Sequence, residues 1–157
     1  MYKIGHGIDV HAFASGRALF LGGIKIPCEK GLAGHSDADA VIHALCDALL
    51  GAAGLGDIGH LFPDTDEKFK DIRSTILLEK VAEKIKDAGY EIANADITII
   101  AQSPKLQPFI SSMRKSLMEI LKTDNINIKA TTTENLGFVG RKEGIEAHAV
   151  CMIKNLQ

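Results

Sequence analysis

The stretch GHGIDVHAF, residues 5–13, decides how the rest of the chain is organised. Residues 2–11 have the apolar character of a β-strand, and strand side chains two positions apart point to the same face. Asp9 and His11 therefore share one face, while the apolar residues beside them take the other. A carboxylate and an imidazole aimed together can form an ion pair, a catalytic pair or part of a metal site. This stretch alone leaves all three open.

Length and composition describe an ordinary globular protein. The 157 residues, 46% hydrophobic and 24% charged, are enough to bury a core, so we expect one domain over residues 1–157. A net charge of −2 gives no electrostatic sign of binding to nucleic acid or to a membrane. The start lacks the layout of a signal peptide, and the cysteines at 28, 46 and 151 share no metal-type spacing. We therefore expect reduced thiols and a cytoplasmic protein.

Turn residues, caps and periodicity predict the secondary structure. A hairpin is expected over 18–26, and a helix from Ser36, as N-cap with Asp39 in capping-box position, to about Gly54. The other expected elements are a polar loop at 56–71, a helix at 73–88, a strand near 95–101, a helix near 107–122, and strands near 126–132 and 145–153. This order predicts an α+β fold in which helices pack on one face of a mixed β-sheet.

The helix expected from Ser36 supplies a third candidate ligand. A lone histidine at position 43, inside an apolar run, is more often a core residue. Asp47 lies four residues further on the same helix face, where it could hold one ring nitrogen of His43, as carboxylates do behind metal-ligating histidines. Asp9, His11 and His43 would then offer one oxygen and two nitrogen ligands. Three protein ligands with an open fourth position are typical of catalytic zinc.

Four motifs between residue 4 and about residue 150 resemble one enzyme family. They are IGHGIDVHAF, GHSDADAVIHALCDALLGAAGLGDIGHLFPDTD, ITIIAQSPKL and KATTTENLGFVGRKEGI. The sequence is similar to the 2-C-methyl-D-erythritol 2,4-cyclodiphosphate synthases of the non-mevalonate route to isoprenoid precursors. Those enzymes convert 4-diphosphocytidyl-2-C-methyl-D-erythritol 2-phosphate into the cyclic diphosphate and CMP. The resemblance implies a phosphorus-oxygen lyase with zinc on Asp9, His11 and His43, in agreement with the ligands inferred from spacing.

The resemblance also implies the rest of the site. Glu134 would hold magnesium or manganese, and His35 and Thr132 would polarise phosphates in the transition state. Residues 57–59 and 62–66 would surround the methylerythritol portion, and residues 101–107 the cytosine and ribose. The implied substrate-binding residues are Asp9, His11, His35, Ser36, Asp57, Ile58, Gly59, Phe62, Pro63, Asp64, Thr65, Asp66, Ala101, Gln102, Ser103, Pro104, Lys105, Leu106, Gln107, Thr131, Thr132, Thr133, Glu134, Phe138 and Arg141.

The resemblance further implies a homotrimer whose sheets face a central axis and whose active sites lie between subunits. His148 would lie near that axis, and Phe138 and Arg141 would border a central cavity. In some relatives this cavity accepts an isoprenoid diphosphate, but relatives with a carboxylate at the position of His148 leave that ligand open here. His6, on the strand face opposite Asp9, is expected to be structural, and His60 is given no role.

Two other functions remain open at this point. A metal-dependent phosphodiesterase would use the same zinc to activate water and would give a linear product. A non-catalytic nucleotide- or metal-binding module would bind CMP without turnover.

Overall fold

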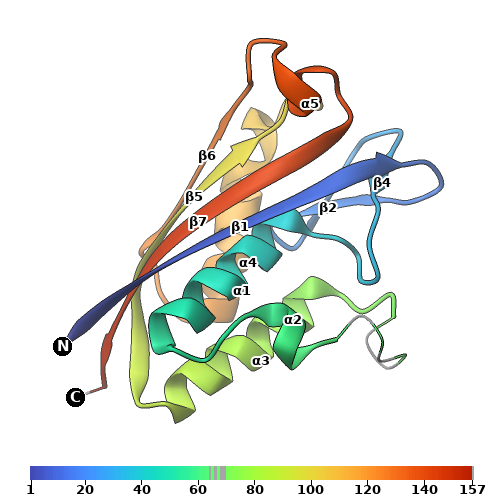
Figure 1. Ribbon diagram of the computed structural model, residues 1–157. Coiled ribbons are helices and arrows are strands. Elements are labelled where there is room, and N and C mark those ends of the chain that lie inside the picture. Colours follow the sequence, from blue (N-terminus) through green and yellow to red (C-terminus); the bar gives the residue numbers. More distant parts are fainter. Residues whose placement is uncertain (64, 66, 68–69, 157) are drawn as a thin grey trace.

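The chain folds into a five-stranded β-sheet covered by helices, with a separate two-stranded hairpin, as the computed structural model in Figure 1 shows for residues 1–63, 65, 67 and 70–156. The strands are β1 (Tyr2–Ala14), β2 (Leu19–Leu21), β3 (Ile24–Ile26), β4 (Gly31–Leu32), β5 (Tyr90–Ile100), β6 (Ile126–Thr131) and β7 (Gly144–Asn155). The helices are α1 (Ala40–Ala53), α2 (Ile58–Leu61), α3 (Ser74–Asp87), α4 (Ile110–Leu121) and α5 (Gly137–Gly140), with a 3₁₀ turn at Gln107–Phe109.

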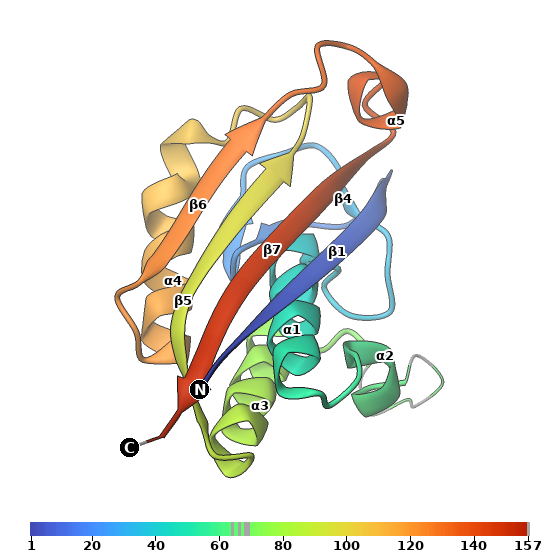
Figure 2. The ribbon, with the colours of Figure 1, turned by 60° about the vertical axis from the view of Figure 1, so that its left-hand side comes forward.

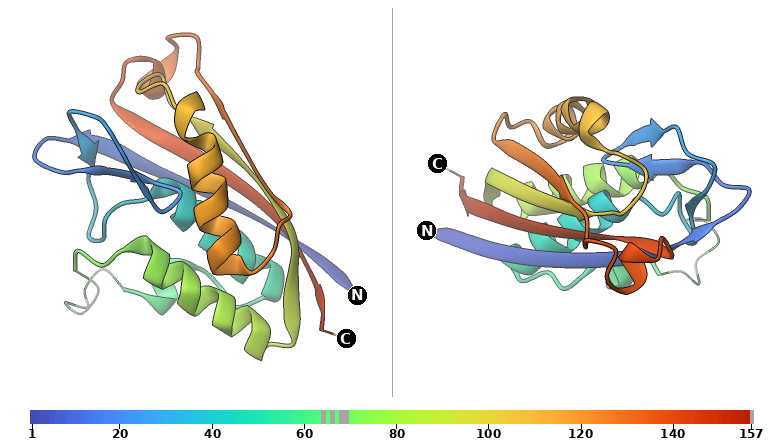
Figure 3. Two further views of the ribbon diagram at one scale, coloured as in Figure 1. Left: turned by 180° about the vertical axis from the view of Figure 1, so that it is seen from behind. Right: turned by 90° about the horizontal axis from the view of Figure 1, so that it is seen from above.

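The main sheet has the strand order β4-β1-β7-β5-β6. β1 and β7 pair antiparallel along almost their whole length, from Tyr2 opposite Lys154 to Ala12 opposite Gly144, whereas β5 and β6 run parallel. In Figure 2 the strands lie in front and α1, α3 and α4 lie behind them, and the left view of Figure 3 shows the same helices from their own side. The prediction of an α+β fold with helices on one face of a mixed sheet is confirmed.

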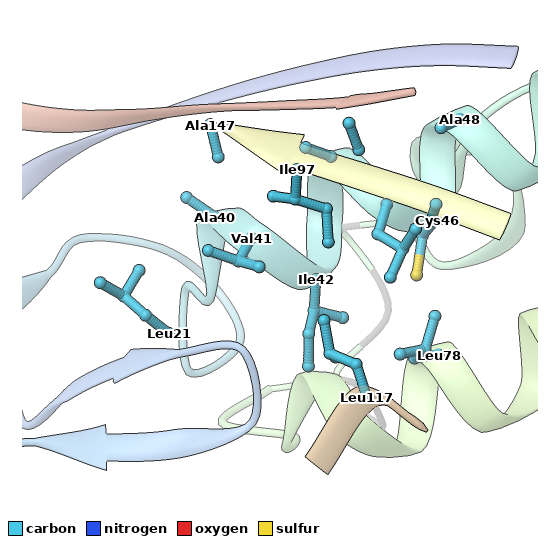
Figure 4. Close-up of a cluster of buried hydrophobic side chains, with 14 of the residues drawn as sticks. Leu21, Ala40, Val41, Ile42, Cys46, Ala48, Leu78, Ile97, Leu117 and Ala147 are labelled. Atoms are coloured by element: carbon cyan, nitrogen blue, oxygen red, sulfur yellow. The ribbon is translucent and has the colours of Figure 1, made fainter. Parts of the chain in front are cut away.

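The hydrophobic core lies between this sheet and helices α3 and α4, with α1 in the middle. Figure 4 shows the side chain of Ile97 of β5 on one side of α1, with Leu78 of α3 and Leu117 of α4 on the other. Ten of the residues of α1 are buried, among them Val41 and Ile42. A helix that is apolar almost all round is stable only in such an enclosed place.

Two glycines let α1 lie directly against β1. A Cβ atom on Gly7 would lie 2.0 Å from the carbonyl oxygen of Ala44, and one on Gly5 would lie 1.8 Å from that of Ala48. Real side chains never approach a backbone so closely, so only glycine permits this packing. The close approach brings His43 of α1 beside the strand that carries Asp9 and His11.

The N-terminus of α1 differs from the prediction. The N-cap is Asp39, whose side chain accepts a hydrogen bond from the backbone N–H of Ile42 at 3.1 Å, and not Ser36. Ala38, at φ 57°, is in the left-handed region and interrupts the helical path between Ser36 and Ala40. The Ser36 hydroxyl instead accepts from the N–H of Ala38 at 3.1 Å, in a local turn. The helix ends as expected, at Gly54 with φ 74°.

Other differences are confined to short elements. The predicted loop at 56–71 contains α2, which Asp57 caps by accepting from the N–H of His60 at 3.0 Å. β5 begins at Tyr90, five residues before the expected start near 95. β4 and α5, with two and four residues, are too short to give a periodic signal. Among the described residues, no helix is long and apolar enough to cross a membrane.

The face of the sheet away from the helices is open and mixed in character. Its large exposed apolar side chains are Tyr2, Ile4, Ile8, Val10 and Val150. Polar groups lie among them: Nε2 of His6 is 3.4 Å from Nδ1 of His148, and Nε2 of His148 is 2.7 Å from an oxygen of Glu146. His6 therefore points away from Asp9 and His11, as the alternation along the strand predicts. We call this surface the open face.

Candidate active site and metal centre

Three candidate ligands converge beside β1 and α1. Asp9 Oδ2 lies 2.8 Å from His11 Nε2 and 3.3 Å from His43 Nδ1, and the two ring nitrogens are 3.2 Å apart. All three residues are partly buried, and one ligand atom from each lies within 4.8 Å of the others. The spacing argument for Asp9 and His11 thus extends to His43 through the close packing of α1 on β1.

The donor geometry around Asp9 fits a cation. Asp9 Oδ2 is buried, yet within the described part of the chain no donor makes a well-directed hydrogen bond to it, although two ring nitrogens are close. A buried carboxylate oxygen without a donor costs about 1–3 kcal/mol or more. A divalent ion bound to this oxygen and to the two nitrogens would remove that cost. One carboxylate and two imidazoles suit zinc and similar ions.

The ring of His11 is oriented for such a role. Its Nδ1 lies 2.7 Å from the carbonyl oxygen of Ala33, which can only accept, so Nδ1 carries the proton. Nε2 is then unprotonated and presents its lone pair to Asp9 and His43. A backbone carbonyl behind a histidine is a common means of fixing a metal-binding tautomer.

The partner of His43 is different from the one expected. We predicted that Asp47 would hold a ring nitrogen, but Oδ1 of Asp47 accepts from the backbone N–H of Ile58 at 2.8 Å and so fixes the start of α2. His43 Nε2 instead lies 3.0 Å from the hydroxyl oxygen of Ser74 and 3.2 Å from that of Ser36. The i, i+4 spacing places Asp47 on the correct helix face but does not determine which donor it accepts from.

The electrostatics favour a negatively charged Asp9. Burial raises the pKa of Asp9, but the imidazoles of His11 and His43, where they are protonated, lower it more, to about 2. Burial lowers the pKa of His11, while the Asp9 carboxylate beside it raises it above its usual value. Asp9 is therefore an anion at any physiological pH, and it is available as a ligand.

A cavity of about 230 Å³ opens beside this cluster. Its lining residues are Asp9, His11, Gly34, His35, Ser36, His43, Ile58, Gly59, Phe62, Ile72 and Leu77. Of the predicted site residues at 57–66, Asp57, Pro63 and Thr65 are exposed, and Asp64 and Asp66 lie outside the described residues. Cavities for small molecules usually measure about 300–1,000 Å³, so this one is small for a nucleotide-linked substrate.

The remaining predicted residues lie together at the ends of β5 and β6. The N–H of Ala101 donates to the carbonyl of Thr131 at 3.0 Å, and the N–H of Asn135 donates to the side-chain oxygen of Gln102 at 3.1 Å. The Thr132 hydroxyl donates to Glu134 at 3.1 Å. The segments 101–107 and 131–134 therefore form one unit, which we call the second half-site.

Within this unit the side chains differ in exposure. Thr132, Glu134, Lys105 and Gln107 are exposed, Gln102, Ser103, Pro104 and Thr133 are half-buried, and Leu106 is buried. Glu134 has a φ of 52°, a strained backbone conformation for a residue with a side chain. Such strain is found where a loop is held in a particular shape.

The strand register separates the second half-site from the metal ligands of the same chain. Asp9 of β1 lies opposite Ala147 of β7, which lies opposite Ile99 of β5, which in turn pairs with Ala130 of β6. Three strand spacings amount to about 14 Å. Within one chain, these two groups of predicted residues thus lie three strands apart, toward opposite edges of the sheet.

Arg141 and Phe138 belong to neither group. Arg141 follows α5 and makes a two-pronged ion pair with Glu143, at 2.9 and 3.2 Å, and Phe138 is half-buried. Figure 1 shows the position of α5 at the end of the sheet.

Sequence reasoning missed Ser74, Asp37 and the carbonyl of Ala33. Ser74 is 31 residues from His43 in the chain and begins a different helix, so no local pattern links the two. Asp37 lies in the motif that begins GHSDAD, without a spacing that would link it to His43 or Ser74. The clustering of hydroxyl and carboxyl residues at 36–39 was the one available signal.

The fold and the site together define a class: an α+β protein with a candidate metal centre of one aspartate and two histidines at the wall of a cavity. The chain belongs to the YgbB family, whose family model matches residues 2–154.

Individual relatives agree with this assignment. A 2-C-methyl-D-erythritol 2,4-cyclodiphosphate synthase of Bacillus cytotoxicus is 59% identical over 156 residues, which are 98% of this chain and 99% of that protein. A solved cyclodiphosphate synthase in its CDP-bound form is 37% identical with a TM-score of 0.89, over 97% of this chain and 100% of that one. The resemblance seen in the sequence motifs is confirmed.

A third relative is larger. The solved bifunctional IspDF of Campylobacter jejuni is 47% identical with a TM-score of 0.96, and the match covers 100% of this chain. This chain spans 43% of the length of the Campylobacter protein.

Proposed function

We propose that this chain is a metal-dependent cyclase that converts 4-diphosphocytidyl-2-C-methyl-D-erythritol 2-phosphate into 2-C-methyl-D-erythritol 2,4-cyclodiphosphate and CMP. The observation that carries the proposal is the cluster of Asp9, His11 and His43 beside a cavity, in a chain 59% identical to synthases of that name. We take residues 1–157 as one synthase domain that acts in the cytoplasm, without a nucleic-acid or membrane partner.

Two ions are part of the proposal. Zinc would be held by Asp9, His11 and His43, and magnesium or manganese by Glu134 together with phosphate oxygens. These ions supply Lewis-acid stabilisation of the phosphate charge. The orphaned oxygen of Asp9 and the tautomer of His11 support the first site. The exposed carboxylate of Glu134 beside Thr132 supports the second.

The reaction asks the protein mainly to position the substrate. An oxygen of the 2-phosphate attacks the β-phosphorus of the diphosphate, a new P–O bond forms, and the bond from the β-phosphorus to the CMP oxygen breaks. Because attack is intramolecular and the nucleophile is already an anion, no serine or cysteine needs to be activated. His35 and Thr132 would stabilise charge on the phosphates during the transfer, and Ser36 would hold the 2-phosphate.

The substrate would lie across both half-sites. Asp57, Ile58, Gly59 and Phe62, with residues 63–66, would surround the methylerythritol portion. Residues 101–107 would hold cytosine and ribose, much of it through backbone groups. Phe62 and Gly59 line the cavity beside the metal ligands, which supports the first assignment.

We further propose a homotrimer with active sites between subunits. A single diphosphate must reach both ions, yet β1, which carries Asp9, and β6, which leads to Glu134, lie about 14 Å apart in one chain. The small cavity and the apolar side chains of the open face also favour a neighbouring subunit. His148 would then lie near the axis.

Phe138 and Arg141 would border the central cavity of this trimer. An isoprenoid diphosphate is the ligand that an aromatic ring and a guanidinium would suit there. Arg141 would have to leave Glu143 to bind its phosphate, which makes this ligand secondary to the trimer itself.

Incubation with the diphosphocytidyl substrate, zinc and magnesium, followed by mass determination of the products, tests the activity. We expect equal amounts of CMP and cyclic diphosphate. A linear product that contains oxygen from labelled water would instead indicate a phosphodiesterase. Saturable binding of CMP without turnover would indicate a binding module.

A further inference from the structure

A buried polar cluster lies behind His43, on the side away from the metal ligands. Asp37 is 8% exposed and Ser74 is fully buried. The carboxylate of Asp37 accepts from Nε of Arg73 at 3.1 Å, from the backbone N–H of Ser74 at 3.1 Å, from that of Asp39 at 3.3 Å, and from the Ser74 hydroxyl. All four of these groups are donors.

The direction of each hydrogen bond in this cluster follows from its chemistry. A carboxylate can only accept, so the hydroxyl proton of Ser74 points to Asp37. The Ser74 oxygen then offers only lone pairs to His43 Nε2, which lies 3.0 Å away. A ring proton on Nε2 satisfies this contact, and Nδ1, which faces Asp9 and His11, is then left with its lone pair.

We propose that Asp37 and Ser74 are positioning residues that fix the metal-binding tautomer of His43. The proposal rests on the proposed role of His43 as a metal ligand. Arg73 balances the charge of Asp37, and its guanidinium also donates to the carbonyl of Gly23 and stacks on Phe20, 4.3 Å from the ring centre. Asp37 is thus fixed as an acceptor by groups that cannot reverse their direction.

The same cluster frees Ser36. The hydroxyl oxygen of Ser36 lies 3.2 Å from His43 Nε2 and accepts from the N–H of Ala38. Because the Ser74 oxygen can accept the hydrogen bond from His43 Nε2, the Ser36 hydroxyl does not have to bond to the ring. It can donate its own proton to a ligand in the cavity. Orientation of the ring and availability of Ser36 are therefore linked.

Asp37→Asn is the most informative variant. An amide nitrogen in place of Oδ2 would face two donors that cannot turn away, Nε of Arg73 and the backbone N–H of Ser74. In place of Oδ1 it faces the Ser74 hydroxyl, which can turn, and only the longer contact with the N–H of Asp39, so the amide nitrogen turns toward Ser74. The Ser74 hydroxyl would then donate to His43 Nε2, and the ring proton would move to Nδ1, where it points at the ion. We expect zinc affinity to fall by about 10–100-fold, the usual effect of losing such a partner.

Ser74→Ala has a different expected effect. It removes the acceptor from Nε2, but the Ser36 oxygen remains within 3.2 Å and can accept the same proton. The tautomer is kept, so zinc affinity should fall less than in Asp37→Asn. The double variant Asp37→Asn/Ser74→Ala should bind zinc more tightly than Asp37→Asn alone. Residue 74 then has no hydroxyl that could turn its proton toward His43 Nε2. A merely structural role would make the two losses add.

Zinc affinity is measured by chelator competition on the metal-free full chain, and the tautomer of His43 by ¹⁵N NMR of the imidazole at about pH 8. Asp71→Asn is the matched control, since it makes the same aspartate-to-asparagine change shortly before Ser74, at an exposed residue with φ 56°, which asparagine tolerates. We expect protonated Nε2 in the wild type, Ser74→Ala and the control, and protonated Nδ1 in Asp37→Asn.

Three results would overturn the proposal: a wild-type His43 protonated at Nδ1, an Asp37→Asn variant with wild-type affinity and tautomer, or a double variant weaker than Asp37→Asn. The wild-type spectrum decides the matter even where a variant does not fold. Tight zinc binding with the predicted tautomers but no cyclic product would refute the proposed function and leave this inference standing.

Discussion

The metal ligands can be tested one side chain at a time. His43→Ala and Asp9→Asn each remove one of three ligands that converge within 4.8 Å, and three ligands leave no replacement. We expect both variants to keep the fold while losing bound zinc and nearly all cyclisation. Zinc content after dialysis, together with product formation, measures this. His60→Ala, a change at an exposed histidine outside the cluster, is the control, and full zinc content with normal turnover in His43→Ala would refute the ligand set.

Asp9 also makes the stability of the metal-free protein depend on pH. The pKa of Asp9 is about 2 in the fold against 3.8 in a free side chain, so on acidification the unfolded state takes up the proton first. The Asp9 anion therefore contributes about 2 kcal/mol of stability above pH 3.8, and this contribution is lost as the pH falls toward 2. Urea unfolding of wild type and Asp9→Asn should show a stability difference that shrinks over this range. A constant difference would contradict the assignment.

Which residue contacts could be predicted depends on their distance in the chain. Asp9 and His11 share a strand, so alternation alone places them together. The partner of His43 could not be predicted, because Ser74 reaches it only through the packing of α3 against α1. Asp47 was expected behind the ring but caps the backbone of Ile58, since a nearby unpaired N–H competes for the same carboxylate.

At the scale of elements, the contact between β1 and α1 decides the position of His43. Gly7→Ala would place a methyl group 2.0 Å from the carbonyl oxygen of Ala44, so the helix must move. We expect a loss of about 2 kcal/mol or more in unfolding free energy, together with weaker zinc binding. Denaturant unfolding and chelator competition measure the two effects.

Gly51→Ala is the matched control for this change. Gly51 lies in the same helix, and nothing lies within 4 Å of the position that its Cβ would take. Alanine there should stabilise the protein by about 0.5–1 kcal/mol, because glycine is a poor helix former. Equal effects at both positions would mean that the close approach does not hold α1 in place.

The presence of the long helices and strands could be predicted better than the residues at which they begin and end. Periodicity identified α1, α3 and α4 and the four long strands of the main sheet, β1, β5, β6 and β7, because each buries an apolar face. The start of α1 was wrong because two residues with N-cap chemistry, Ser36 and Asp39, stand close together. Only the left-handed Ala38 decides between them, and an alanine gives no sign of that conformation in a sequence.

At the scale of the whole molecule, a shared active site makes a specific prediction. Asp9→Asn subunits have an intact second half-site, and Glu134→Gln subunits have intact metal ligands. In a cyclic trimer, each mixed assembly would rebuild one complete site between subunits. An equal mixture, unfolded and refolded together, should regain about a quarter of the wild-type activity. Sedimentation confirms that trimers form, and an inactive mixture of intact trimers would show that the half-sites do not combine.

The place of β7 in the sheet has a consequence for biosynthesis. The last strand of the chain is also the central one, since it separates β1 from β5. While the chain emerges from the ribosome, β1 is made before β7, and it waits for this longest pairing partner until the residues up to Gly144 have been added. Pairings between such distant segments form slowly, and unpaired strands are prone to aggregate meanwhile. A nascent chain halted before Gly144 would therefore contain all three metal ligands but no completed sheet to hold them. Premature termination just before Gly144 should thus be as damaging as loss of β1.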